Sequence, residues 1–412
     1  MEMRPDLSVA SCRFGRRRPF PLPPGADEPR RSAPANSEPG TAVGASRGHE
    51  SDPYPCRVRP RLRPDLHGVP AYKAGARITA PGGPSWSLAS NEVPFGPLPG
   101  VMEAVAERLP DLHRYPDPAA STLSAALSER LGVGIDELTL GTGSVAVCQQ
   151  AVMAACSPGD EVVYAWRSFE AYPIVTTLVS ARSVQVPLLP DSRHDLPAMA
   201  AAVTDRTRVI FVCTPNNPTG PAVTDAELVD FLDRVPDDVL VVVDEAYYEF
   251  GLGSHEHDLD AVAVSRGRPN VMVLRTFSKA YGLAGLRVGY GVASPIVAAA
   301  MRKTAIPFGV SLIAQTAALA SLDQTDELLR RVAAVRDERT RVMAAAQSLG
   351  YDIPDSRANF YWVPLGHAAE SFAHRCREHG VTVRAFPDEG VRITVGEPDA
   401  NDRVLSLLGQ EG

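Results

Sequence analysis

Lysine is nearly absent from this chain. Only three of its 41 lysine and arginine side chains are lysines, at positions 73, 279 and 303. The chain therefore carries its positive charge almost wholly on arginine. A lone lysine is ordinarily a solvated surface residue, but in this composition a retained lysine is a better candidate for chemistry.

Paired cysteines and long apolar runs are also missing. The six cysteines have no Cys-x-x-Cys spacing, which favours reduced thiols over disulfides or a zinc site. No stretch approaches the roughly 18 apolar residues that a membrane helix needs. The formal net charge of −8 gives little attraction for nucleic acid or anionic membranes. We therefore expect a cytoplasmic protein with no metal, no nucleic-acid partner and no membrane partner.

The chain changes character along its length. Residues 1–60 are rich in Pro, Arg, Gly and Ser and have almost no periodic apolar positions, so we expect a disordered tail. From about residue 98, helical patterns alternate with short β-branched runs, which indicates an α/β fold with a mainly parallel sheet. The expected strands are 161–165, 183–188, 208–213, 239–243, 271–274 and 288–292. A long helical pattern that ends at Leu349-Gly350 introduces a second, smaller domain.

One of the three lysines has a distinctive setting. Lys279 follows the hydroxyls of Thr276 and Ser278, and Arg287 stands eight residues later. An amine beside hydroxyls and a guanidinium suits a Schiff base with a phosphorylated aldehyde such as pyridoxal phosphate. The alternative is a surface lysine.

A glycine turn precedes an expected helix. The segment Gly141-Thr142-Gly143-Ser144 follows an apolar run and opens a helical pattern. Glycines let the backbone approach an anion, and a helix N-terminus offers free N–H groups, so the turn is a candidate phosphate site. A tight turn without a ligand explains it equally well.

Polar residues follow two further expected strands. The segment PNNPTG, residues 215–220, places adjacent amides at a strand's C-terminal edge, where α/β sheets bind ligands. Asp244 directly follows the apolar run 239–243, where an unpaired carboxylate would be costly. A protonated pyridine nitrogen would supply the cationic partner that such a carboxylate needs, although a helix N-cap is the simpler interpretation.

The order of these segments resembles the fold-type I aminotransferases, specifically the histidinol-phosphate aminotransferase subfamily, over residues 65–405. The matching segments are Tyr72, Ser90-Asn91-Glu92, Tyr115-Pro116-Asp117, the Gly141 turn, 215–220, 244–247, Lys279 with Arg287, Ala358-Asn359-Phe360 and 392–396. The resemblance implies a pyridoxal-phosphate fold with a large α/β domain and a smaller one. It places an N-terminal arm at 61–98, the large cofactor-binding domain at 99–310 and the small domain at 311–412.

The resemblance also implies roles for individual residues. Lys279 would hold the cofactor and move the proton at the substrate α-carbon, Asp244 would keep the pyridine nitrogen protonated, and Tyr247 with Asn217 would bind the ring oxygen. The other cofactor contacts would come from Gly143, Ser144, Val145, Phe169, Thr276, Ser278 and Arg287. Tyr72 would reach the phosphate from the second subunit of a homodimer. Substrate contacts would come from Asn91, Asn359, Arg384 and Arg392.

The substrate leaves alternatives open. The turn carries Val145 where many histidinol-phosphate enzymes carry acidic residues, and aromatic residues crowd 164–172 and 360–362. These features are similar to the actinobacterial aromatic amino acid aminotransferases, which use 2-oxoglutarate. Histidinol-phosphate transamination is the main alternative, and a threonine-phosphate decarboxylase and a cofactor-sensing transcription regulator are more remote ones.

Overall fold

A computed structural model describes residues 63–64, 66, 85–253 and 259–410. Its main feature is a seven-stranded sheet in the order β2-β8-β7-β6-β5-β3-β4. The strands are β2 (Leu138–Gly141), β3 (Glu161–Trp166), β4 (Arg182–Pro187), β5 (Thr207–Cys213), β6 (Leu240–Asp244), β7 (Val271–Thr276) and β8 (Gly289–Val292). All neighbouring strands are parallel except β8, which is antiparallel to both β2 and β7. The α/β class and the six expected strands are confirmed, with ends that agree within two residues.

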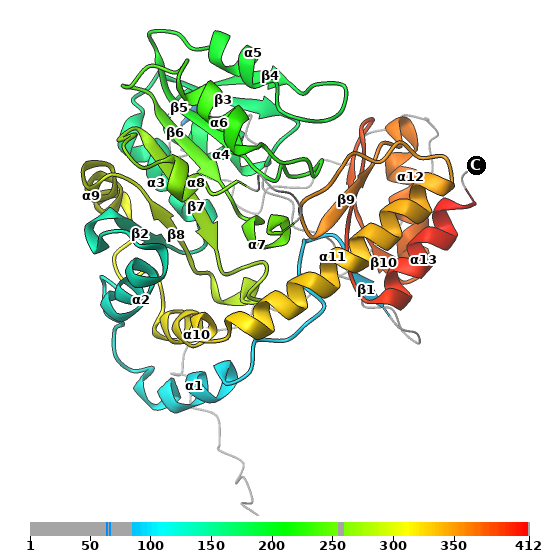
Figure 1. Cartoon of the computed structure of the whole chain (residues 1–412), viewed down its shortest axis with the longest axis horizontal. Coiled ribbons are helices and arrows are strands. Elements are labelled where there is room, and N and C mark those ends of the chain that lie inside the picture. The colour runs from blue at the N-terminus through cyan, green and yellow to red at the C-terminus, as the bar shows by residue number, and fades with distance from the viewer. Residues whose placement is uncertain (1–62, 65, 67–84, 254–258, 411–412) are drawn as a thin grey trace, which may run out of the picture. The chain divides into compact units, whose positions relative to one another are not determined.

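Helices cover both faces of this sheet (Figure 1). Alternate residues of a strand point to opposite faces. Ile210 and Val241 accordingly belong to one apolar cluster with Phe231 of α6, whereas Phe211 and Val242 belong to a second cluster with α3 and α4. The helices of this part are α3 (Ser144–Ala155), α4 (Ala171–Leu178), α5 (Leu196–Ala201), α6 (Asp225–Leu232), α7 (Tyr248–Gly251), α8 (Ala261–Val264) and α9 (Pro295–Thr304). Burial on both faces explains why the central strands are continuous apolar runs.

Two smaller sheets lie toward the C-terminus. Strand β12 (Gly390–Thr394) is antiparallel to both β11 (Arg384–Phe386) and β9 (Phe360–Val363), and Arg384 stands directly opposite Arg392 in the ladder. A second pair joins β1 (Trp86–Ser87) to β10 (Val381–Thr382). The N-terminal segment before residue 90 therefore adds a strand beside C-terminal residues.

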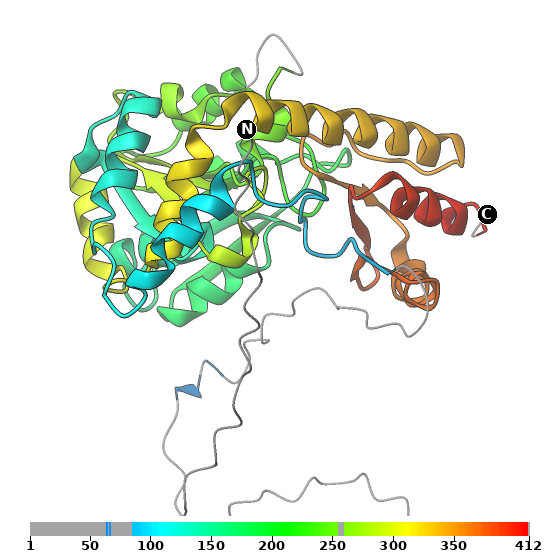
Figure 2. The same ribbon diagram turned by 90° about the horizontal axis from the view of Figure 1, so that it is seen from below.

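One long helix connects the two sheet regions (Figures 1 and 2). Helix α11 (Thr325–Ser348) has 24 residues and ends just before Gly350, whose φ is 95°. The expected helix end at Leu349-Gly350 is confirmed. The remaining helices are α1 (Val101–Arg108), α2 (Ser121–Leu131), α10 (Leu312–Leu322), α12 (Ala369–Glu378) and α13 (Pro398–Leu408), with short 3-10 turns at Leu109–Asp111, Ile135–Glu137, Ala284–Leu286 and Gly366–Ala368.

The domain boundaries at residues 98 and 310 stay a prediction. The expected tail, residues 1–60, and Tyr72 lie outside the described residues. Within the part of the chain that the structure describes, no helix is both long enough and apolar enough to cross a bilayer.

Candidate active site

The strand register brings the polar segments together. Cys213 at the end of β5 lies opposite Asp244 of β6, which in turn lies opposite Leu274 of β7. Parallel strands end at the same edge, so the segments that follow them meet there. A cavity of about 230 Å³ opens at this edge. The predicted site residues that line it are Asn91, Ser144, Val145, Phe169, Asn217, Asp244, Tyr247, Thr276, Ser278, Lys279, Arg287, Arg384 and Arg392.

Lys279 projects its amine toward the segment before α1. Its Nζ donates hydrogen bonds to the carbonyl oxygens of Ser90 (3.0 Å) and Asn91 (3.2 Å). Burial, followed by the nearby guanidinium of Arg392, lowers the pKa of Lys279 to about 7. An ordinary lysine is almost fully charged at this pH, whereas here a substantial fraction of the amine is neutral and nucleophilic.

This lowered pKa predicts how the cofactor-free protein reacts with acylating reagents. Only the neutral amine reacts, so labelling of Lys279 should rise with pH to half its maximum near pH 7. An ordinary lysine side chain reaches that point near pH ~10.4. Trace acetylation followed by peptide mass spectrometry measures both, with N-acetyl-lysine amide as the reference. A midpoint for Lys279 that coincided with the reference would contradict the assignment.

The N-terminus of α3 forms a cradle with Arg287. Gly143, with φ of 82°, precedes the helix, and the Nη1 of Arg287 donates to the Ser278 hydroxyl at 3.1 Å. A Cβ atom on Gly289 would lie only 2.5 Å from the Ser144 nitrogen, so the backbones can approach here only because position 289 is glycine. Free N–H groups, a guanidinium and hydroxyls are the donor set that a phosphate group requires.

Asp244 provides the complementary charge in the same cavity. Its carboxylate accepts hydrogen bonds from the Tyr172 hydroxyl (2.8 Å) and from the backbone N–H of Ala246 (3.3 Å). Burial raises the pKa of Asp244 to about 6, so a cation beside it would be strongly favoured. A phosphate cradle, an amine of low pKa and a buried carboxylate in one cavity therefore fit pyridoxal phosphate.

Tyr172 offers a test of this carboxylate. Its hydroxyl favours the ionised form of Asp244, so Tyr172→Phe should raise the pKa of Asp244 and move the acidic limb of the pH–rate profile to higher pH. The ring would still stack on Phe211 (4.3 Å between centroids), so the loss in kcat should stay near tenfold. Tyr164→Phe is the matched control, because the Tyr164 hydroxyl accepts from Gln185 instead. An unmoved acidic limb in Tyr172→Phe would refute the expectation.

Arg392 reaches the cavity from β12. Its Nη1 donates to the side-chain oxygen of Asn217 (2.5 Å), and its Nη2 donates to the Ala89 carbonyl (2.6 Å). Asn91 donates from its amide to the Tyr247 hydroxyl at 2.8 Å. The small sheet and the PNNPTG segment are thus joined directly at the cavity.

Two predicted residues that the structure describes, Asn359 and Gly143, do not line the cavity. Asn359 is buried, and its side-chain amide donates to the backbone carbonyls of Asn91 (3.1 Å), which lines the cavity, and of Glu92 (3.4 Å). Gly143 shapes the turn in front of Ser144, and Tyr72 is outside the described residues. The substrate role of Asn359 and the subunit-crossing role of Tyr72 stay predictions.

Sequence reasoning missed several residues of the site. Tyr172, Glu170 and Phe386 were not among the predicted site residues, although the first two belong to the aromatic segment 164–172. Glu170 and Phe386 line the cavity, and Glu170 forms an ion pair with Arg384 at 2.7 Å. The sequence does show an acidic residue, Glu170, directly after Phe169. Its role becomes visible only once the structure places Arg384 beside it.

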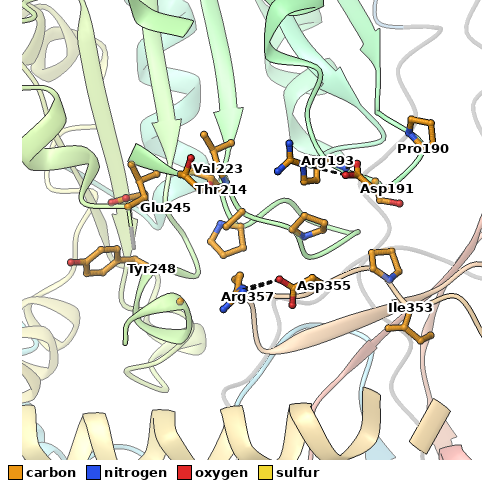
Figure 3. Close-up of a pocket in the computed structure, with 18 of the residues that line it drawn as sticks. Pro190, Asp191, Arg193, Thr214, Val223, Glu245, Tyr248, Ile353, Asp355 and Arg357 are labelled. Carbon is orange, nitrogen blue, oxygen red and sulfur yellow. Dashed lines mark hydrogen bonds and ion pairs between the residues drawn. The ribbon is translucent and has the colours of Figure 1, made fainter. Parts of the chain in front are cut away.

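A second, larger cavity of about 840 Å³ lies beside the segments 190–193 and 352–357. Figure 3 shows Arg193 beside Asp191 and Arg357 beside Asp355, and these ion pairs measure 3.3 and 2.9 Å. Among the described residues, the two cavities have no lining residue in common. The larger cavity lacks the lysine and the cradle, so the smaller one is the candidate active site.

Comparisons with known proteins agree on one family. A model of the aminotransferase class I and II family matches residues 85–408. An aromatic amino acid aminotransferase of Streptomyces avermitilis is 58% identical over 348 residues, which are 84% of this chain and 96% of the relative. One of Rhodococcus jostii is 53% identical over 350 residues, 85% of this chain and 96% of the relative. A histidinol-phosphate aminotransferase from Sinorhizobium meliloti, solved with pyridoxal-5'-phosphate, aligns with a TM-score of 0.78 and 28% identity over 86% of this chain and 98% of its own.

Proposed function

The chain belongs to the class I and II aminotransferase family, and on this premise we propose that it transfers the amino group between aromatic amino acids and 2-oxoglutarate. Its cofactor is pyridoxal 5'-phosphate. The observation that carries the proposal is the position of Lys279, whose pKa of about 7 leaves a nucleophilic amine in a cavity with both a phosphate cradle and a buried carboxylate.

The chain's own residues divide the work of this reaction. The bound cofactor supplies an aldehyde that joins to amines and a ring that accepts electrons from the substrate. Lys279 holds the cofactor and then moves a proton at the substrate α-carbon through Nζ. Arg287, Ser278 and the first turn of α3 hold the phosphate, and Asp244 holds a proton on the ring nitrogen. Arg392 orients the α-carboxylate through its two-pronged guanidinium.

The proposed preference for aromatic substrates rests on the relatives and on apolar residues that line the cavity. Val145, Phe169 and Phe386 line it, and Phe386 lies beside Trp362 with 5.4 Å between ring centroids. Aromatic side chains form an apolar surface at small entropic cost.

We further propose that the protein works as a homodimer in which Tyr72 of one subunit serves the other subunit's cofactor. Support comes from exposed apolar side chains that a partner would cover: Tyr115 and Phe308 stack at 4.7 Å between centroids, and Leu112 and Ile306 are also exposed. A mass measurement by light scattering tests this directly, because a monomer would contradict it. The cytoplasmic location stays a prediction.

The deciding experiment compares amino donors. Purified holoenzyme should transaminate phenylalanine with 2-oxoglutarate at a higher kcat/KM than histidinol phosphate. The histidinol-phosphate alternative shares the cofactor and the catalytic lysine, so the spectrum of the bound cofactor does not separate the two. Turnover of histidinol phosphate alone would overturn the proposed substrate class while leaving the family unchanged.

A further inference from the structure

An ion pair lies in the wall of the active-site cavity. Glu170 directly precedes α4 in the large sheet region, whereas Arg384 begins β11 in the small sheet. The Nη2 of Arg384 donates to the Oε2 of Glu170 at 2.7 Å, and both residues line the cavity. The Glu170 side chain is 32% exposed and that of Arg384 is 17% exposed, so the carboxylate is the partner with access to water.

Arg384 is expected to contact the substrate, but the proposed reaction gives it no defined partner there. The cationic residues among those that line the cavity are Lys279, Arg287, Arg384 and Arg392. Lys279 serves the chemistry, Arg287 lies at the phosphate cradle and Arg392 is placed for the α-carboxylate. Arg384 stands opposite Arg392 in the β11–β12 ladder, at the distance of a neighbouring side chain. It is therefore positioned for a second anionic group on the same substrate.

The proposed reaction makes contradictory demands on this position. One half-reaction brings an uncharged aromatic side chain, and the other brings the distal carboxylate of glutamate or 2-oxoglutarate. An aromatic ring that covers Arg384 would bury its guanidinium without a hydrogen-bonded anion, which costs free energy, and a carboxylate buried without a cation is costly as well. A single fixed charge cannot serve both substrates.

We propose that Glu170 is a specificity-determining residue that acts as an exchangeable counter-ion for Arg384. This inference rests on the proposed aromatic aminotransferase function. With an aromatic substrate, Glu170 keeps the pair neutral while the ring lies beside Phe386. With a dicarboxylic substrate, the distal carboxylate takes the place of Glu170 on the guanidinium, and Glu170 turns into water. The guanidinium lies 5.6 Å from the Phe386 ring centroid, so one surface serves both substrates.

The neighbouring ion pair provides a matched control. Arg167 pairs with Glu389, so these residues join the same two segments with the charges reversed. Arg167 also lies over the Trp166 ring (4.3 Å) and near the Phe386 ring (5.4 Å). Neither Arg167 nor Glu389 is among the residues that line the active-site cavity. Loss of Glu389 therefore removes a link between the segments without changing the charge that faces the substrate.

Single-turnover half-reactions of the holoenzyme with phenylalanine and with glutamate test the inference. In Glu170→Gln, Arg384 is freed from competition, so the apparent affinity for glutamate should rise roughly five- to tenfold while that for phenylalanine falls. The ratio of the apparent affinity for glutamate to that for phenylalanine should thus rise. The change should appear in the apparent substrate affinity, and the limiting rate at saturating substrate should stay the same. Glu389→Gln should change both substrates by the same factor.

The outcomes separate the two proposals. If Glu170→Gln leaves the ratio unchanged, shifts it toward phenylalanine or behaves like Glu389→Gln, the counter-ion role is refuted. If Glu170→Gln does not fold, Glu170→Asp provides the same comparison, since a shorter carboxylate reaches Arg384 less well and should shift the ratio in the same direction. A wild-type protein that accepts only histidinol phosphate would instead refute the proposed function.

Discussion

Replacement of Lys279 with alanine should lower phenylalanine transamination by about 10⁴-fold or more. The variant loses the Nζ amine, which we propose holds the cofactor and then moves the proton at the substrate α-carbon. Among the described residues, Lys279 is the lysine that lines the cavity. The measurement is the single-turnover rate with phenylalanine, together with the absorbance of the protein-bound cofactor, which should lose the band of the lysine-linked form.

Lys303→Ala is the control for this variant. Lys303 is exposed in the last turn of α9 and does not line the cavity, so its replacement removes a lysine without touching the site. Its activity should match that of the wild type. Wild-type turnover in Lys279→Ala would end the enzymatic interpretation of the cavity.

Arg392→Ala should produce the second large effect, a loss of roughly 10²- to 10³-fold in kcat/KM. Arg392 is buried and its guanidinium is held by hydrogen bonds to Asn217 and Ala89, which would orient it for the proposed contact with the α-carboxylate. Every amino acid substrate carries that carboxylate, so phenylalanine and glutamate should lose activity by similar factors. This uniform loss differs from the opposite changes expected of Glu170→Gln.

Two further variants complete the test of Arg392. Arg392→Lys keeps the charge but loses the two-pronged geometry, so its kcat/KM should lie between those of the wild type and the alanine variant. Arg377→Ala removes an exposed arginine of α12 and should change neither substrate. If Arg392→Ala spared glutamate while it impaired phenylalanine, the α-carboxylate assignment would be wrong.

The parts of the fold that depend on local sequence could be predicted. Strands β5 and β6 are apolar runs followed by turn residues, and the end of α11 is marked by Gly350, so their positions follow from neighbours in the chain. Lys279 could be identified because the hydroxyls of Thr276 and Ser278 precede it within three residues and Arg287 follows it by eight. The same local evidence placed Asp244 at a strand end.

Contacts between distant segments could not be predicted in this way. The hydrogen bond from Tyr172 to Asp244 joins residues 72 apart, and that from Arg384 to Glu170 joins residues 214 apart. Asp244 was expected to need a cationic partner, and among the described residues its hydrogen-bond donors are the Tyr172 hydroxyl, the Cys148 thiol and the backbone N–H of Ala246, none of which is a cation. The lowered pKa of Lys279 likewise depends on burial and on Arg392, which no pattern around position 279 encodes.

The ladder position of Arg384 opposite Arg392 has a consequence for how this site can change over evolution. Backbone hydrogen bonds between two antiparallel strands set the spacing of the two Cα atoms from which these side chains extend, so side-chain substitutions elsewhere leave that spacing intact. The pairing of β11 with β12 therefore limits how far apart two carboxylates of one substrate can lie if Arg384 and Arg392 are to bind both. The counter-ion Glu170 belongs to a different segment of the chain. Acceptance of uncharged side chains, which depends on Glu170, and the length of dicarboxylic substrate that fits, which depends on the β11–β12 pairing, can therefore be altered one at a time.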